Sequence, residues 1–126
     1  MLRRLATAAA LSIALATSAL AADGKTHRVA IQVDQNDPAV MNLALNNATN
    51  VVEFYRGRRE RVDVDIVAYG PGLNMLRADT SPVADRIRSL KDVAFPDTVR
   101  FSACNVTKEG MEKKEGKTLA DRKSVV

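Results

Sequence analysis

The segment VDVDIVAYGPG, residues 62–72, carries the clearest information about the fold. Apolar and acidic residues alternate over residues 62–66, and residues 66–69 are continuously apolar. That pattern is typical of a strand that becomes more buried along its length. Gly70, Pro71 and Gly72 then stop the strand, because these residue types favour a turn over a continued ladder. The stretch therefore predicts a buried β-strand with a tight turn at its carboxyl end.

Two more β-prone runs flank this strand, at residues 28–33 and 99–104. Helical patterns separate the three runs. Asp37 and Pro38 suit the cap and first position of a helix that ends at Gly57, and Ser81 and Pro82 suit the start of a second helix. Regular alternation of strand and helix predicts a small three-layer α/β domain of the doubly wound type, with a parallel sheet between helices.

The composition excludes several functional classes. Of the 126 residues, 46% are apolar and 27% are charged, which is typical of a globular chain, and the net charge is +4. A single Cys excludes an internal disulfide and a zinc site built on several thiolates, and a single His excludes a multi-histidine cluster. We therefore expect no metal and no cofactor.

Residues 1–21 have the pattern of a secretory signal peptide. A basic start at Arg3 and Arg4 precedes an apolar run, and Ala19 and Ala21 provide the small residues of a cleavage site. An uncleaved membrane anchor is the alternative, but the run is shorter than the roughly 20 residues that a bilayer needs. We expect a mature domain over residues 22–126, exported to a periplasm, with no membrane association after cleavage.

Cys104 is the candidate nucleophile. Ligands of parallel sheets bind at the carboxyl ends of the strands. The sequence brings three segments to that edge, residues 34–37, 69–74 and 104–106. We expect Thr107 to cap a third helix that ends near residue 115, so that Cys104 lies just before a helix start, where free N–H groups favour a thiolate. The alternative interpretation is a small, packed residue at a strand end.

The turn Gly70-Pro71-Gly72 allows the backbone to approach a ligand closely, although a plain tight turn explains the same residues. A cluster of arginines follows the first helix: Arg56, Arg58, Arg59 and Arg61. Nucleic acid is one interpretation of such a cluster. A solvated loop or a contact with an acidic group is favoured instead, because the cluster lies at the far end of the sheet from Cys104 and the protein is expected to be exported. We expect no nucleic-acid partner.

Three segments resemble the DsrE/DsrF-like family, in particular its small exported members. They are DPAVMNLALNNA at residues 37–48, AYGPGLNML within residues 64–76, and FSAC at residues 101–104. The resemblance extends over about residues 28–117 and implies a flavodoxin-like fold, assembly into trimers or hexamers, and sulfur relay through a cysteine persulfide. Cys104 matches that cysteine by position. Asn105 stands where many exported relatives have Gly, and relatives continue beyond Val126, so a truncated last strand and helix are expected.

These observations lead to one leading hypothesis and two alternatives. The leading one is a periplasmic sulfur carrier that holds a persulfide on Cys104 and exchanges sulfur with a donor or acceptor protein, with Gly70, Pro71, Gly72 and Asn105 as candidate ligand-binding residues. The first alternative is a non-catalytic oligomeric module that binds a ligand or partner, with a structural cysteine. The second is thiol exchange that joins Cys104 to another chain.

Overall fold

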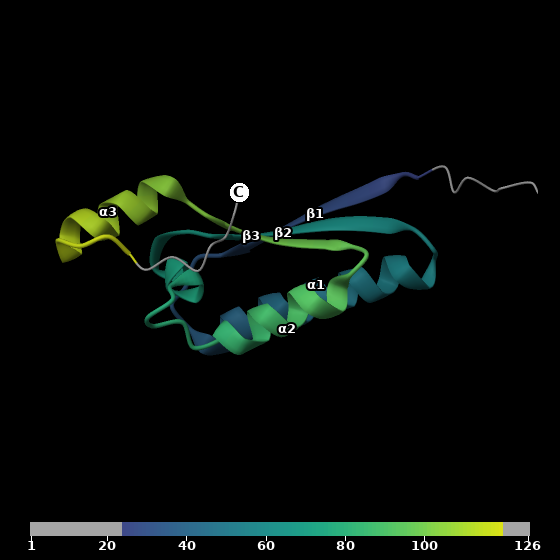
Figure 1. Ribbon diagram of the computed structural model, residues 1–126, viewed down its shortest axis with the longest axis horizontal. Coiled ribbons are helices and arrows are strands. Elements are labelled where there is room, and N and C mark those ends of the chain that lie inside the picture. Colours follow the sequence, from purple (N-terminus) through teal and green to yellow (C-terminus); the bar gives the residue numbers. More distant parts are fainter. Residues whose placement is uncertain (1–23, 120–126) are drawn as a thin grey trace, which may run out of the picture.

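The computed structural model describes residues 24–119. The expected signal peptide, residues 1–21, lies outside this range, as does the chain after Leu119, where a truncated last strand and helix are expected. Within the described range the elements follow in the order β1, α1, β2, η1, α2, β3 and α3 (Figure 1). Strand and helix alternate as the sequence predicts.

The sheet consists of β1 (Thr26–Val33), β2 (Arg61–Ala68) and β3 (Thr98–Ala103), in that spatial order and all parallel. The predicted α/β class is confirmed, and a three-stranded parallel sheet flanked by helices is consistent with a small flavodoxin-like domain. The register pairs Val33 with Ala68 and Ala68 with Ala103. All three strands therefore end at the same level, and the loops that follow them start side by side.

Helices α1 (Pro38–Gly57) and α2 (Ala84–Ala94) both lie against one face of the sheet (Figure 1). The core forms between them and that face, and its fully buried side chains include Met41, Leu45 and Ile66. Burying each such side chain stabilises the fold by about 1.5–3 kcal/mol. Because the strand order is β1-β2-β3, two right-handed crossovers place both helices on the same side. The third layer that the sequence predicts is therefore not formed by α1 or α2.

The second face of the sheet is polar. The register places Arg28 beside Asp63, and Asp65 beside Arg100. The Asp65 carboxylate accepts a hydrogen bond from the Ser102 hydroxyl at 2.7 Å. Charged residues at alternating positions make this face unsuitable for an apolar helix, so the alternation at residues 62–66 marks a strand that is buried on one side.

The helix starts agree with the sequence at α1 and differ at α2 and α3. The Asp37 carboxylate caps α1 by accepting from the Ala39 N–H at 2.7 Å, as predicted. By contrast, α2 begins at Ala84 with Val83 at its cap position, and the Ser81 hydroxyl donates to the Met75 carbonyl and accepts from the Val83 N–H at 3.4 Å. Helix α3 (Asn105–Glu115) begins two residues before Thr107. The cap position of α3 is therefore Cys104 itself.

Contacts at the opposite edge of the sheet explain the positions of Arg56 and Arg61, two members of the arginine cluster. The Asp97 carboxylate is buried, lies 3.5 Å from both Arg56 and Arg61, and accepts from the Val62 N–H at 3.1 Å. Arg56 also donates to the carbonyls of Val93, Ala94 and Phe95 at the end of α2. These two arginines thus bind an acidic group and the last carbonyls of a helix within their own chain.

Candidate functional site

Backbone hydrogen bonds join the three strand ends into one surface. The Tyr69 N–H donates to the Val33 carbonyl at 3.1 Å, and the Cys104 N–H donates to the Ala68 carbonyl at 3.0 Å. Each of the two strand pairs thus extends by one hydrogen bond past its last paired residues. The loops after β1, β2 and β3 meet at this edge, where the topology of a parallel sheet places ligand sites.

The turn after β2 opens the short 3-10 helix η1 (Gly70–Leu76). Gly70 has φ +51°, a left-handed conformation that favours glycine. Gly72 is buried against the end of β1, where a Cβ would lie 2.2 Å from the Val33 carbonyl oxygen. Packing thus requires Gly72, which supports the tight-turn interpretation for that residue. Gly70 and Pro71, in contrast, line an open cavity.

Cys104 is half-buried at the cap of α3. The backbone N–H of Thr107 lowers the pKa of the Cys104 thiol most, and the Thr107 hydroxyl and the Val106 N–H lower it further. Partial desolvation opposes these hydrogen bonds and raises the pKa, but the net shift is downward. The start of a helix thus stabilises the thiolate form of Cys104.

Thr107 connects the cysteine to the turn after β2. Its hydroxyl accepts a hydrogen bond from the Gly70 N–H at 3.1 Å and donates to the Cys104 sulfur. The Thr107 side chain therefore links α3 to η1 and also stabilises the thiolate. The sequence identifies Thr107 only as a helix cap, so its contact with the sulfur is a finding of the structure.

A cavity of about 540 Å³ opens beside this contact, between η1 and α3. The η1 side contributes Gly70, Pro71, Asn74 and Arg77, the loop after β1 contributes Asn36, and α3 contributes Thr107, Gly110, Met111, Lys114 and Glu115. Of the ligand-binding residues that the sequence suggests, Gly70 and Pro71 lie in this wall. Gly72 does not line it, and Asn105 instead donates to the Glu109 carboxylate at 2.6 Å.

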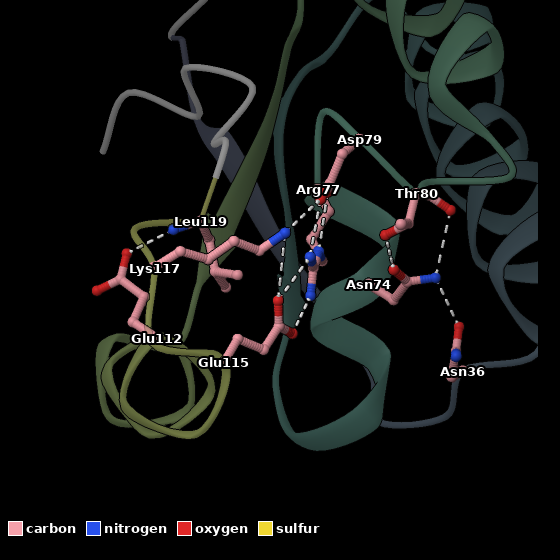
Figure 2. Close-up of polar contacts among 9 residues, drawn as sticks. All are labelled: Asn36, Asn74, Arg77, Asp79, Thr80, Glu112, Glu115, Lys117 and Leu119. Carbon is pink, nitrogen blue, oxygen red and sulfur yellow. Dashed lines mark hydrogen bonds and ion pairs between the residues drawn. The ribbon is translucent and has the colours of Figure 1, made fainter.

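Arg77 lines the cavity and is the centre of a cluster of ion pairs (Figure 2). Its side chain is only 11% exposed and binds two carboxylates: Asp79 at 2.8 and 3.0 Å, and Glu115 at 2.5 and 3.1 Å. Lys117 lies 3.7 Å from both carboxylates. Hydrogen bonds from Arg77 hold the pKa of Asp79 and of Glu115 below their usual values. This cluster attaches the end of α3 to the segment after η1.

A second polar chain supports the cavity from the η1 side (Figure 2). Asn74 donates to the Asn36 side-chain oxygen at 2.8 Å and accepts a hydrogen bond from the Thr80 hydroxyl. The loop after β1 is thereby held against η1. Asn74 appears within the predicted edge segment, residues 69–74, whereas the sequence offers no signal for Arg77, whose partner Glu115 is 38 residues away.

Residues 24–119 contain no group of three or more His, Cys, Asp and Glu side chains arranged to hold a metal ion. In the same range no helix combines the length and the apolar composition needed to span a bilayer.

Comparison with known proteins gives one structural match. The chain is similar to the solved structure of a protein of unknown function, MTH1491, from Methanobacterium thermoautotrophicum, with a TM-score of 0.57 and 26% sequence identity. The match covers 79% of this chain and 76% of that chain. No family model matches, and no curated protein matches. The match supports the α/β fold, while the resemblance to the DsrE/DsrF-like family rests on the sequence motifs.

Proposed function

We propose that this protein is a sulfur carrier that holds a persulfide on Cys104. The observation that carries the proposal is the environment of the thiol. Cys104 is half-buried, not fully buried, and its sulfur receives hydrogen bonds from Thr107 and Val106 that lower its pKa. A thiolate is the nucleophile in sulfur exchange, so these contacts favour the reaction. The resemblance to the DsrE/DsrF-like family supports the same role.

The carrier step needs no oxidant or reductant beyond the sulfur donor. The Cys104 thiolate attacks the outer sulfur of a donor persulfide, R–S–SH, and a new S–S bond forms. The donor's S–S bond breaks, its electron pair leaves on the donor sulfur as R–S⁻, and the proton stays on the transferred sulfur. Unloading is the reverse reaction with an acceptor thiolate. The N–H groups at the start of α3 stabilise the negative charge that returns to the Cys104 sulfur.

The cellular location of the protein and its partners are also part of the proposal. Export to a periplasm rests on the pattern at residues 1–21, and self-association and exchange with a donor or acceptor protein rest on the family resemblance. The alternative, a ligand- or partner-binding module with a structural cysteine, is supported by the cavity between η1 and α3. The two functions differ in whether Cys104 accepts sulfur.

Intact mass spectrometry of the mature protein distinguishes the sulfur carrier from the binding module. After treatment with polysulfide, the carrier should gain about 32 Da per bound sulfur, and a reducing agent should remove that mass. Cys104→Ser should gain nothing, and Thr107→Ser should still gain it because the hydroxyl is kept. A folded wild-type protein that shows no reducible gain would contradict the sulfur carrier and favour the binding module.

A further inference from the structure

The cavity between η1 and α3 has the size of a small-molecule site. Its volume of about 540 Å³ falls within the roughly 300–1,000 Å³ of typical ligand pockets. Thr107, which contacts the Cys104 sulfur, is part of its wall. Thr107 therefore connects the reactive sulfur to the cavity, although Cys104 itself is not one of the lining residues.

The charges around the cavity favour an anion. Arg77 is neutralised by Asp79 and Glu115, and Lys117 balances the second carboxylate. Lys114 also lines the cavity, and it makes no ion pair with any residue between 24 and 119. The uncompensated charge on the wall is therefore positive, so a carboxylate is preferred over an ammonium group.

The other wall groups suit an organic molecule rather than a bare inorganic ion. Met111 and Pro71 provide apolar contact for a carbon skeleton. Asn36 accepts from Asn74 through its side-chain oxygen, and within the described range no residue accepts from its amide nitrogen. That amide and Lys114 both line the cavity and are donors that a carboxylate can accept from.

We propose that this cavity binds a small thiol that carries a carboxylate, and that this molecule is the acceptor of the sulfur held on Cys104. The inference rests on the proposed function. In the step, the bound thiolate attacks the outer sulfur of the Cys104 persulfide, the S–S bond breaks, and its electron pair returns to the Cys104 sulfur. The proton of the persulfide stays on the transferred sulfur, so the product is the persulfide of the small thiol.

Gly110 allows the cavity to be filled without harm to the fold. It lies in the middle of α3 and lines the cavity, and no atom lies within 4 Å of the position of an added Cβ. Gly110→Leu therefore places a side chain in open space at the cavity wall. Leucine also has a higher helix propensity than glycine, so the substitution should not destabilise α3.

The test measures binding of S-methylglutathione, which cannot react, to the mature Cys104→Ser protein by calorimetry. We expect saturable binding, weakened about tenfold by Gly110→Leu and about fivefold by Lys114→Glu. Lys113→Glu is the matched control, because Lys113 does not line the cavity and should change the affinity by less than about twofold. S-methylcysteamine, which carries an ammonium and no carboxylate, should not bind measurably.

The outcomes separate the cavity from the carrier function. No binding of S-methylglutathione, binding unchanged by both cavity variants, or equal binding of S-methylcysteamine would overturn the acceptor site, whether or not Cys104 forms a persulfide. Binding that responds to both variants, in a protein whose Cys104 gains no sulfur, would retain the anion site and overturn the carrier. If S-methylglutathione binds as expected and Cys104 also gains sulfur, the persulfide of the wild-type protein should pass its sulfur to glutathione. Gly110→Leu should slow that transfer about tenfold.

Discussion

Gly72 lies so close to the end of β1 that an added Cβ would be 2.2 Å from the Val33 carbonyl oxygen and 2.6 Å from the Val33 carbonyl carbon. The neighbouring atoms belong to the backbone of a sheet strand and have no room to move. We expect Gly72→Ala to lower the free energy of unfolding by about 3 kcal/mol, the upper range for overpacking. Chemical denaturation measures this change.

Gly57→Ala is the control for that substitution. No atom lies within 4 Å of a Cβ at Gly57, the last residue of α1, and alanine has the higher helix propensity. Its stability should therefore match or slightly exceed that of the wild type. A Gly72→Ala protein as stable as Gly57→Ala would contradict the close packing of η1 against β1.

Thr107→Val should raise the pKa of Cys104. The substitution removes the hydroxyl that donates to the sulfur but keeps the backbone N–H, which has the largest effect on the pKa. The pH profile of alkylation by iodoacetamide should therefore move toward that of an ordinary cysteine without reaching it. Thr107→Ser keeps the hydroxyl and should restore the wild-type profile. An unchanged profile for Thr107→Val would show that the hydroxyl does not solvate the thiolate.

Arg77→Gln should loosen α3 while the sheet stays intact. No residue of α3 is buried, so the helix depends on polar contacts such as those of Arg77 with Glu115 and Asp79. Amide hydrogen exchange should become faster over residues 105–115 and stay unchanged in β2. Arg88→Gln removes an exposed ion pair with Asp85 on α2 and should change neither region. Faster exchange throughout the protein would instead mean that Arg77 supports the whole fold.

Acid should break the ion pairs of Arg77 with Asp79 and Glu115. The folded-state pKa values of Asp79 and Glu115 lie below their usual values, and hydrogen bonds from Arg77 are the main cause. For such a depressed acid, the stabilising contribution is fully present above the unfolded-state pKa and is lost as the pH falls through the folded-state pKa. The protection of α3 against hydrogen exchange, relative to the intrinsic exchange rate at each pH, should therefore be constant near neutrality and fall in acid. Arg77→Gln should weaken this acid response, and an equal response in both proteins would contradict the assignment.

Local sequence patterns predict the fold well because strands and caps depend on neighbouring residues. The burial of β2 follows from the residues that run from Val62 to Ala68, and the α1 cap follows from Asp37 and Pro38. The starts of α2 and α3 are less predictable. The hydroxyls of Ser81 and Thr107 both suit a cap, yet in the structure Thr107 binds Gly70 and Cys104, and Ser81 donates to Met75 while it accepts from the Val83 N–H before the helix begins.

The candidate site was predictable only where it lies at strand ends. The edge position of Cys104 and the wall position of Gly70 follow from the parallel topology. The Arg77 cluster does not, because it joins residues 38 positions apart through long side chains. The cavity wall on α3 depends on how that helix is oriented, and no local pattern around Gly110 specifies this. The polar second face was not predicted, because the alternation of strand and helix favours helices on both faces, and the acidic positions Asp63 and Asp65 were interpreted only as the less buried start of the strand.

The strand order has a consequence for aggregation. Within residues 24–119, β2 is the strand with a neighbour on both sides, so β1 and β3 are edge strands whose outer backbone groups form a template for another chain. Cationic residues mark both edges: Arg28 on β1 and Arg100 on β3. Two copies that approach edge to edge bring like charges together, which disfavours uncontrolled growth of the sheet. Neutral replacements at Arg28 and Arg100 should therefore increase the tendency of the protein to aggregate, with little change in its folded structure.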